Sequence, residues 1–133
     1  MTSSDFPSAL SVHHVAVVVA NLERAEQFYV GVLGLRVIRR WDDAEARPRS
    51  IWCELAAGAF LAIERAEVEG PKRNELAPGF HCVALGIRPD EREKWRERLE
   101  RAGVAVFRES AYTLYVRDPD GNIVGLSHFP DER

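Results

Sequence analysis

Two stretches of the chain repeat the same order of hydrophobic and polar positions. Each begins with a short apolar run that contains a histidine, at 11–19 and again at 79–87. Each continues with a segment whose apolar residues recur every three or four positions, then a glycine and further short apolar runs. Short apolar runs are typical of strands, and three- to four-residue spacing of helices. The pattern predicts an α+β fold built from two copies of one βαβββ module.

The first copy begins with a strand at about 12–19, rich in β-branched residues. Asn21 then caps a helix whose apolar residues form one stripe, and Gly34 ends that helix in the left-handed conformation. Three further strands follow, the last two as a hairpin, at 35–41, 50–55 and 59–65.

The second copy begins with a strand from Phe80. Asp90 and Glu93 fit a capping box at the start of its helix, and Gly103 ends that helix. A strand over 104–107 and a hairpin complete the module. The hairpin has strands at 112–116 and 122–129 and turns through Asp118-Pro119-Asp120-Gly121.

These elements predict one domain after a loose tail. The tail covers 1–11, and the domain covers 12–129, divided into module one (12–66), a charged linker (67–79) and module two (80–129). One helix covers only one face of a four-stranded sheet. We therefore expect a cupped mixed β-sheet, with a helix outside each module and a ligand or partner on the inner face.

The composition excludes several classes of function. A net charge of −3 without a basic block argues against nucleic-acid binding, and no apolar run is long enough to cross a membrane. The first residues lack the basic start and apolar core of a signal peptide, and Cys53 and Cys82 have no metal or redox spacing. We expect a cytoplasmic protein.

Alternation along the strands assigns faces to the candidate chemical groups. His14 lies on the face opposite the more apolar set of its strand, whereas His13 takes its place if the register slips by one residue. The side chain of Glu64 lies on one face of its strand, and those of Leu61 and Ile63 lie on the other face. In the second module the same rule groups His81 with Val83, Leu85 and Ile87. His14, Glu64 and His81 are thus expected to meet on the concave side.

A family resemblance rests on three stretches of the chain. They are His14-Val15-Ala16-Val17 continued through Asn21-Leu22-Glu23-Arg24-Ala25, Phe28-Tyr29 and Val32-Leu33-Gly34-Leu35; Phe80-His81-Cys82-Val83-Ala84-Leu85; and Val116-Arg117-Asp118-Pro119-Asp120-Gly121-Asn122. Together they resemble the vicinal oxygen chelate superfamily over about 12–129. That superfamily includes glyoxalase I, extradiol dioxygenases, fosfomycin-resistance transferases, methylmalonyl-CoA epimerases and bleomycin-binding proteins, so the resemblance is informative about fold and says little about the reaction.

The resemblance implies a divalent metal held by the first, fourth, fifth and last strands. The matching residues are His14, Glu64 and His81, but the usual last-strand glutamate is replaced by Gly125. Two imidazoles and one carboxylate are enough for a catalytic metal with open positions, and the sequence does not distinguish zinc, nickel, iron, manganese and magnesium. The alternative is that both histidines are inherited and bind no metal.

Two functions remain open. The first is a metal-dependent lyase, isomerase or dioxygenase acting on a small oxygen-rich substrate, although without the glutamate its catalytic base is unknown. The second is a metal-free small-molecule binding protein of the bleomycin-resistance type. Arg39, Arg49 and Arg117 are candidates for contact with an anionic ligand. The candidate substrate-binding residues are Trp41, Trp52, Phe60, Tyr112 and Tyr115. In either case the resemblance implies a homodimer.

Overall fold

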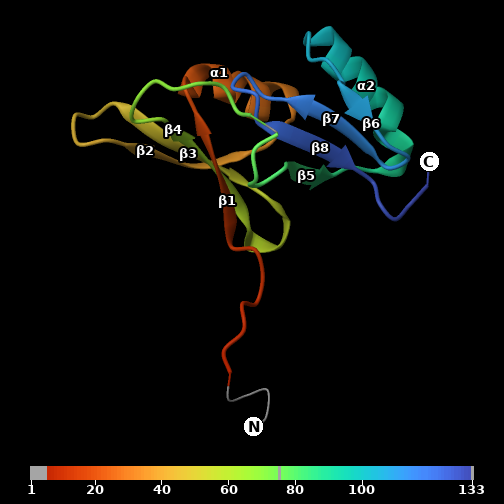
Figure 1. Cartoon of the computed structure of the whole chain (residues 1–133), viewed down its shortest axis with the longest axis horizontal. Helices are drawn as coiled ribbons and strands as arrows, with labels where there is room; N and C mark the ends of the chain where they lie inside the picture. Colours follow the sequence, from red (N-terminus) through yellow and green to blue (C-terminus); the bar gives the residue numbers. More distant parts are fainter. Residues whose placement is uncertain (1–5, 75, 133) are drawn as a thin grey trace.

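The strands form two four-stranded sheets, one from each predicted module (Figure 1). The computed structural model describes residues 6–74 and 76–132. Sheet A has the order β1 (His14–Val19), β4 (Phe60–Arg65), β3 (Pro48–Glu54) and β2 (Val37–Asp42). Sheet B has the order β5 (Val83–Gly86), β8 (Ile123–Ser127), β7 (Thr113–Arg117) and β6 (Arg108–Glu109). In each sheet the first two strands are parallel and the others antiparallel, which confirms the paired βαβββ prediction.

The helix of the first module forms where the apolar stripe predicts it. It consists of α1 (Leu22–Glu26) and a π-helical segment, η2 (Gln27–Val32). Asn21 caps it, because the backbone N–H of Arg24 donates to Asn21 Oδ1 at 2.9 Å. Gly34, at φ +77°, takes the left-handed conformation that ends it.

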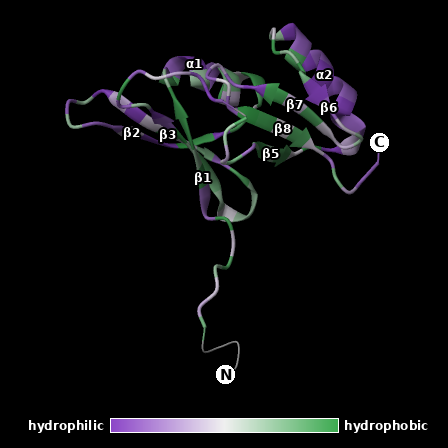
Figure 2. Cartoon of the chain, in the orientation of Figure 1, coloured by the Kyte–Doolittle hydropathy of each residue, from purple (hydrophilic) through white to green (hydrophobic). Residues whose placement is uncertain are grey.

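The second helix, α2 (Arg92–Arg101), begins after a 3₁₀ turn, η4 (Pro89–Glu91). The predicted capping box is wrong, since the residue at the N-cap is Glu91 and no side chain caps the helix there. The carboxylate of Asp90 instead forms an ion pair with Arg88 at 3.0 Å. Figure 2 shows that α2 is largely hydrophilic, while much of sheet B beside it is hydrophobic.

Two strand predictions in the second module also need correction. The strand placed at 104–107 lies later, since β6 covers only Arg108–Glu109. The strand placed from Phe80 begins only at Val83, which pairs with Val124 on β8. The described residues just before Val83 have no ladder partner on β8, because the chain opposite them forms the turn at 118–122 and the ladder starts after that turn.

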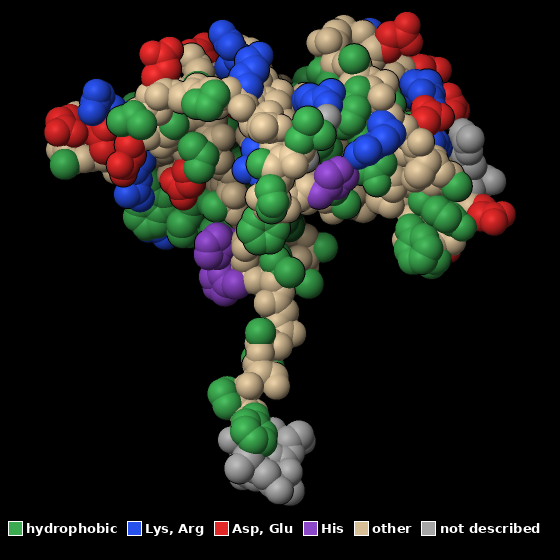
Figure 3. Space-filling model, in the orientation of Figure 1, with side chains coloured by type: hydrophobic (Ala, Val, Ile, Leu, Met, Phe, Trp, Pro, Cys, Tyr) green, Lys and Arg blue, Asp and Glu red, His purple; other side chains and the backbone are tan. Residues whose placement is uncertain are grey.

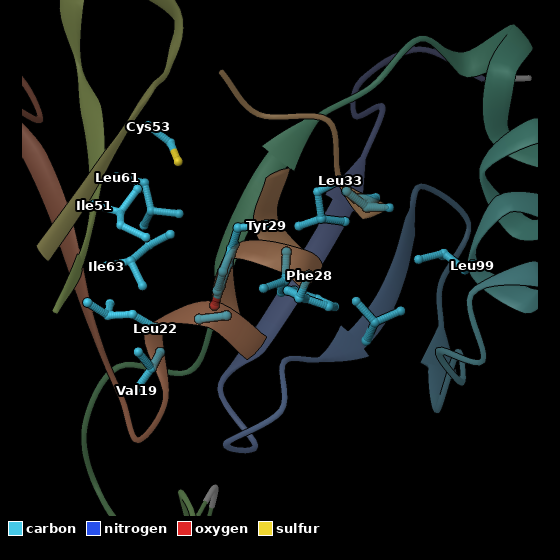
Figure 4. Packing of buried hydrophobic residues seen from close by; sticks show 14 of the residues in the cluster. Val19, Leu22, Phe28, Tyr29, Leu33, Ile51, Cys53, Leu61, Ile63 and Leu99 are labelled. Atoms are coloured by element: carbon cyan, nitrogen blue, oxygen red, sulfur yellow. The ribbon is translucent and has the colours of Figure 1, made fainter. Parts of the chain in front are cut away.

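One hydrophobic core joins the two modules (Figure 4). The first strand, β1, alternates as expected, so that Val15, Val17 and Val19 face the core while His14 and Ala16 face outward. The helix of module one contributes Leu22, Ala25, Phe28, Tyr29 and Leu33; sheet A contributes Ile51, Leu61 and Ile63; and the second module contributes Leu99, Leu114, Val116, Val124 and Leu126. Burial of this apolar surface is the main stabilising contribution.

A buried hydrogen bond ties the helix of module one to the hairpin of module two. The hydroxyl of Tyr29 donates to Asp118 Oδ2 at 2.7 Å, and both residues are buried. Burial, together with the adjacent carboxylate, raises the pKa of Tyr29 above its ordinary value of 10.0. Asn122 adds a bond to the carbonyl of Val18 at 3.2 Å.

The described part of the chain contains no helix long and apolar enough to span a membrane.

Candidate functional site

A row of aromatic rings crosses the face of sheet A that no helix covers. We call His14, Phe60, Trp52 and Trp41 the aromatic row. The ring of His14 stacks on Phe60 at 4.8 Å between centroids, and Phe60 stacks on Trp52 at 4.3 Å. Trp41 meets Trp52 edge-on at 5.3 Å, and the guanidinium of Arg39 lies 4.0 Å from the centre of the Trp41 ring. The row exposes aromatic surface that ends in a cation.

Strand register produces this row. In the parallel pair, His14 lies opposite Phe60, and in the antiparallel pairs Trp52 lies opposite Arg39 and Trp41 opposite Ser50. Residues directly opposite one another share a face, so four strands bring these side chains to one surface. The predicted grouping of Trp41, Trp52 and Phe60 is found in the structure.

Glu64 lies far from His14, although both are on the open face. Glu64 is opposite Val18 on β1 and opposite Ser50 on β3, four residues after Phe60. At a rise of about 3.3 Å per residue, this offset separates the two backbones by about 13 Å along the strand direction. The residue opposite the first-strand histidine is therefore aromatic, and the carboxylate stands at the other end of the sheet.

His81 lies on the second module, beside a cation. Its Nε2 is 2.9 Å from a guanidinium nitrogen of Arg108, and its ring centroid is 6.1 Å from that of Tyr115. The guanidinium donates this bond, so it occupies the lone pair that a metal would need. Arg108 also lies over the Tyr115 ring, 4.9 Å from its centroid.

The predicted face of His81 needs a correction. Leu85 and Ile87, grouped with His81 by alternation, pack against the hydrophobic core on the helix side. His81 reaches the open side, beside Tyr115, because it precedes β5, where the pleat no longer dictates which way a side chain points. Tyr115 shares the open face of sheet B with its register partners Gly125 and Arg108.

The structure does not bring the predicted metal ligands together in one chain. Among the described residues, no group of three or more His, Cys, Asp or Glu side chains is placed to hold a metal ion. Figure 3 shows histidine side chains in separate places on the surface. The arrangement within one chain thus does not fit a metal ion, and the set of His14, Glu64 and His81 stays a prediction.

The position of the absent fourth ligand is closely packed. A Cβ on Gly125 would lie 3.1 Å from Cγ2 of Thr113 and 3.5 Å from Cε1 of Tyr115. A side chain here would require a shift of neighbouring atoms, so glycine lets the Thr113 and Tyr115 side chains lie against this strand.

Other predicted site residues lie elsewhere. Tyr112 is at the far end of module two, where its ring contacts those of His128 and Phe129 at 5.8 and 5.1 Å. His13 precedes β1, and its Nδ1 is 2.9 Å from Nδ1 of His14.

Arg117 lies over Phe107, 3.7 Å from the ring centroid. A hollow of about 340 Å³ near that pair contains none of the aromatic row; it is lined by Phe28, Gly103, Val104, Ala105, Phe107, Arg117, Asp118 and Pro119.

Two residues of these surfaces were missed in the sequence. Ser50, on the face of Trp52, was detectable by alternation along 48–54. Arg108 was overlooked because its strand was placed at 104–107, before it.

Comparison with known families agrees with the paired modules. Residues 11–126 match the model of the glyoxalase/bleomycin resistance protein/dioxygenase superfamily. The chain belongs to this superfamily. Two curated relatives bear enzyme names. A lactoylglutathione lyase of Neisseria meningitidis serogroup A is 28% identical over 116 residues, covering 81% of this chain and 83% of its own. Glutathione transferase FosA of Serratia marcescens is 24% identical over 120 residues, covering 87% and 79%.

Solved structures share the fold of this chain. The protein SMU.1112c superposes with a TM-score of 0.76 at 24% identity, covering 91% of this chain and 100% of that one. The fosfomycin resistance protein FosX of Listeria monocytogenes, in a complex with Mn(II) and sulfate, superposes with a TM-score of 0.69 at 20% identity, covering 92% and 93%. These identities support the shared fold alone, and the function must be argued from the site.

Proposed function

We propose that this superfamily member binds a flat, ring-containing small molecule on the open face of sheet A, and that this binding needs no metal. The observation that carries the proposal is the aromatic row, in which Phe60 takes the place opposite His14. Aromatic rings offer large contact areas in which stacked geometry adds about 0.5–1.5 kcal/mol beyond burial.

The surroundings of the row support a ring-shaped ligand. Phe60, Trp52 and Trp41 are half-buried, so their neighbours hold their orientation while part of each ring remains accessible. A preordered surface loses little conformational entropy on binding. Arg39 makes no ion pair with any described residue, so its guanidinium is available to a ligand at the end of the row.

We also propose that a second copy of the chain covers this surface. Val18 on the open face is exposed, and Phe80 beside His81 has 95% of its surface exposed. Exposed apolar residues on a sheet face are typical of an interface. Sedimentation that shows only monomers at micromolar concentration would contradict the homodimer. A cytoplasmic location stays a prediction from the sequence.

Titration with quinoline tests ring binding. We expect saturable binding by calorimetry, unchanged by a chelator and at least tenfold weaker in Trp52→Ala. Trp95→Ala, which changes a tryptophan on α2, is the matched control and should bind like the wild type. Circular dichroism establishes that both variants are folded, and Phe60→Leu is a milder second test of the row. Equal binding by the wild type and both row variants would overturn the proposal.

The second candidate is the metal-dependent lyase, isomerase or dioxygenase. The enzyme names of the two curated relatives favour it, as does the exposure of His14 on module one and of His81 on module two. Because His14 and His81 do not meet within one chain, such a site requires a second copy, and three protein ligands are usual for a catalytic metal. Elemental mass spectrometry should then find near one metal per chain, lost in His14→Ala and in His81→Ala. Protein that takes up no divalent ion under any condition would contradict this candidate.

A further inference from the structure

Three polar atoms beside the aromatic row are buried without a hydrogen-bond partner. They are Oγ of Ser50, Nε1 of Trp41 and Nε1 of Trp52. Ser50 is only 1% exposed, and its hydroxyl has no partner among the residues that the structure describes. Buried polar groups are nearly always paired, since an unpaired one costs about 1–3 kcal/mol. Three such atoms on one sheet face indicate a missing partner.

The three atoms belong to adjoining positions of sheet A. Ser50 lies between Trp41 on β2 and Glu64 on β4, both its direct partners in register, and Trp52 is the next residue of β3 on the same face. Opposite residues have Cβ atoms about 4.5–5.5 Å apart, so the four side chains are neighbours. Glu64 is half-buried and makes no hydrogen bond or ion pair with a described residue.

The chemistry of this group is mixed. Ser50 and the two indoles donate hydrogen bonds, whereas the carboxylate of Glu64 accepts them. A ligand edge that satisfies both must carry an acceptor next to a donor. A carboxylate ligand would meet the charge of Glu64 directly, and like charges repel strongly where water is excluded. The matching edge is a neutral amide or lactam, C=O beside N–H.

We propose that the group formed by Ser50, Trp41, Trp52 and Glu64 selects planar heterocycles that carry a lactam edge. This inference rests on the proposed ring-binding function and names its ligand class. The ring stacks on the aromatic row, the C=O accepts from Ser50 and an indole N–H, and the N–H donates to Glu64. Glu64 is half-buried and lies directly beside Ser50, so rotation of the Glu64 side chain opens access to the Ser50 hydroxyl.

Matched two-ring compounds test the selection by calorimetry at neutral pH. Quinoline has the rings without the lactam edge, 2-quinolone has the edge, N-methyl-2-quinolone lacks the donor, and quinoline-2-carboxylate is an anion. The lactam edge is expected to make 2-quinolone bind about five- to tenfold more tightly than quinoline. The N-methyl compound keeps the C=O and loses only the bond to Glu64, so it should also bind less tightly than 2-quinolone. Ser50→Ala and Glu64→Gln should each reduce this preference. Ser127→Ala, on the open face of sheet B, is the matched control.

The outcomes separate the inference from the function on which it rests. Quinoline binding that depends on Trp52, with 2-quinolone no tighter, overturns the lactam edge and keeps the ring-binding function. Absence of binding by all four compounds overturns both. A preference for 2-quinolone that survives Ser50→Ala, or tighter binding of the carboxylate than of 2-quinolone, also overturns the inference. In that case ordered water satisfies the buried atoms, or Arg39 dominates recognition.

Discussion

The imidazole of His14 lies flat on the ring of Phe60, with centroids 4.8 Å apart and planes only 6° from parallel. The register between the parallel strands β1 and β4 decides which residue of β4 lies opposite His14. A carboxylate in place of Phe60 would lie opposite His14, and the two side chains could together supply two ligands of a metal ion. Phe60 makes His14 the end of an aromatic surface that continues through Trp52 and Trp41.

Phe60→Glu tests the importance of this register. The variant places a carboxylate opposite His14, and we expect it to bind zinc or nickel more tightly than the wild type, measured by calorimetry with a chelator competition. Loss of the stacks on His14 and Trp52 should lower the free energy of unfolding by about 1–2 kcal/mol. Phe60→Gln is the control, since it removes the ring without adding charge. Equal metal affinity in the two variants would show that the His14–Phe60 pair is not positioned as a ligand pair.

Tyr29→Phe tests the bond between the modules. Asp118 keeps its bonds from the Asp120 and Asn122 backbone and from the Asn122 side chain, so we expect a loss of about 1.5–3 kcal/mol in urea unfolding. A loss below about 0.5 kcal/mol would indicate that water replaces the hydroxyl. Phe28→Leu, a neighbouring core change, serves as a comparison that leaves the hydrogen bond intact.

Alkaline unfolding provides a second test of Tyr29. Burial and the Asp118 carboxylate raise its folded-state pKa above the ordinary value of 10.0, so the folded protein holds a proton that the unfolded chain releases. This contribution is complete below pH 10 and is lost as pH rises beyond it. The slope of stability against pH above 10 should therefore be shallower in Tyr29→Phe than in the wild type. Equal slopes would assign the alkaline loss to other groups.

Asp43 should determine the acid response of the β2–β3 loop. Its carboxylate accepts from the backbone N–H groups of Arg47 and Glu45 and from Arg65, and these bonds lower its pKa from 3.8 to about 2. A depressed folded-state pKa stabilises the protein above pH 3.8, and this contribution is lost as pH falls from 3.8 towards 2. Carboxyl NMR should find the midpoint near 2, and Asp43→Asn should remove that part of the acid dependence. An Asp43 midpoint near 4 would mean that the loop bonds are not formed in solution.

Replacement of Ser50 by alanine should stabilise the protein or leave its stability unchanged. The buried hydroxyl has no described partner, so its removal should raise the free energy of unfolding by about 1 kcal/mol or leave it unchanged. Thermal denaturation without ligand measures this. A clear loss would show that an ordered water satisfies the hydroxyl. Thr113→Val is the contrasting variant, since Thr113 donates to Ser127 at 2.9 Å and its replacement should destabilise the protein.

Most of the architecture was predictable from local signals. The stripe from Leu22 to Leu33, the cap at Asn21 and the turn through Asp118-Pro119-Asp120-Gly121 depend on neighbouring residues, and all three were confirmed. The strand predicted from Phe80 failed because of a distant partner, since the chain opposite Phe80 forms a turn and β5 begins only at Val83. The capping box at Asp90 failed although its signal is local.

Periodicity and capping act within a few residues, so the two βαβββ modules, the buried helix stripe and the outward face of His14 follow from the amino-acid sequence. The pairing of Phe60 with His14, of Glu64 with Ser50 and of His81 with Arg108 arises only in the folded chain. The first two relationships depend on the register between paired strands, and the third on a contact between His81 and a segment far away in the chain. A shift of a few residues along a strand moves a side chain by several ångströms, and no local pattern records that offset.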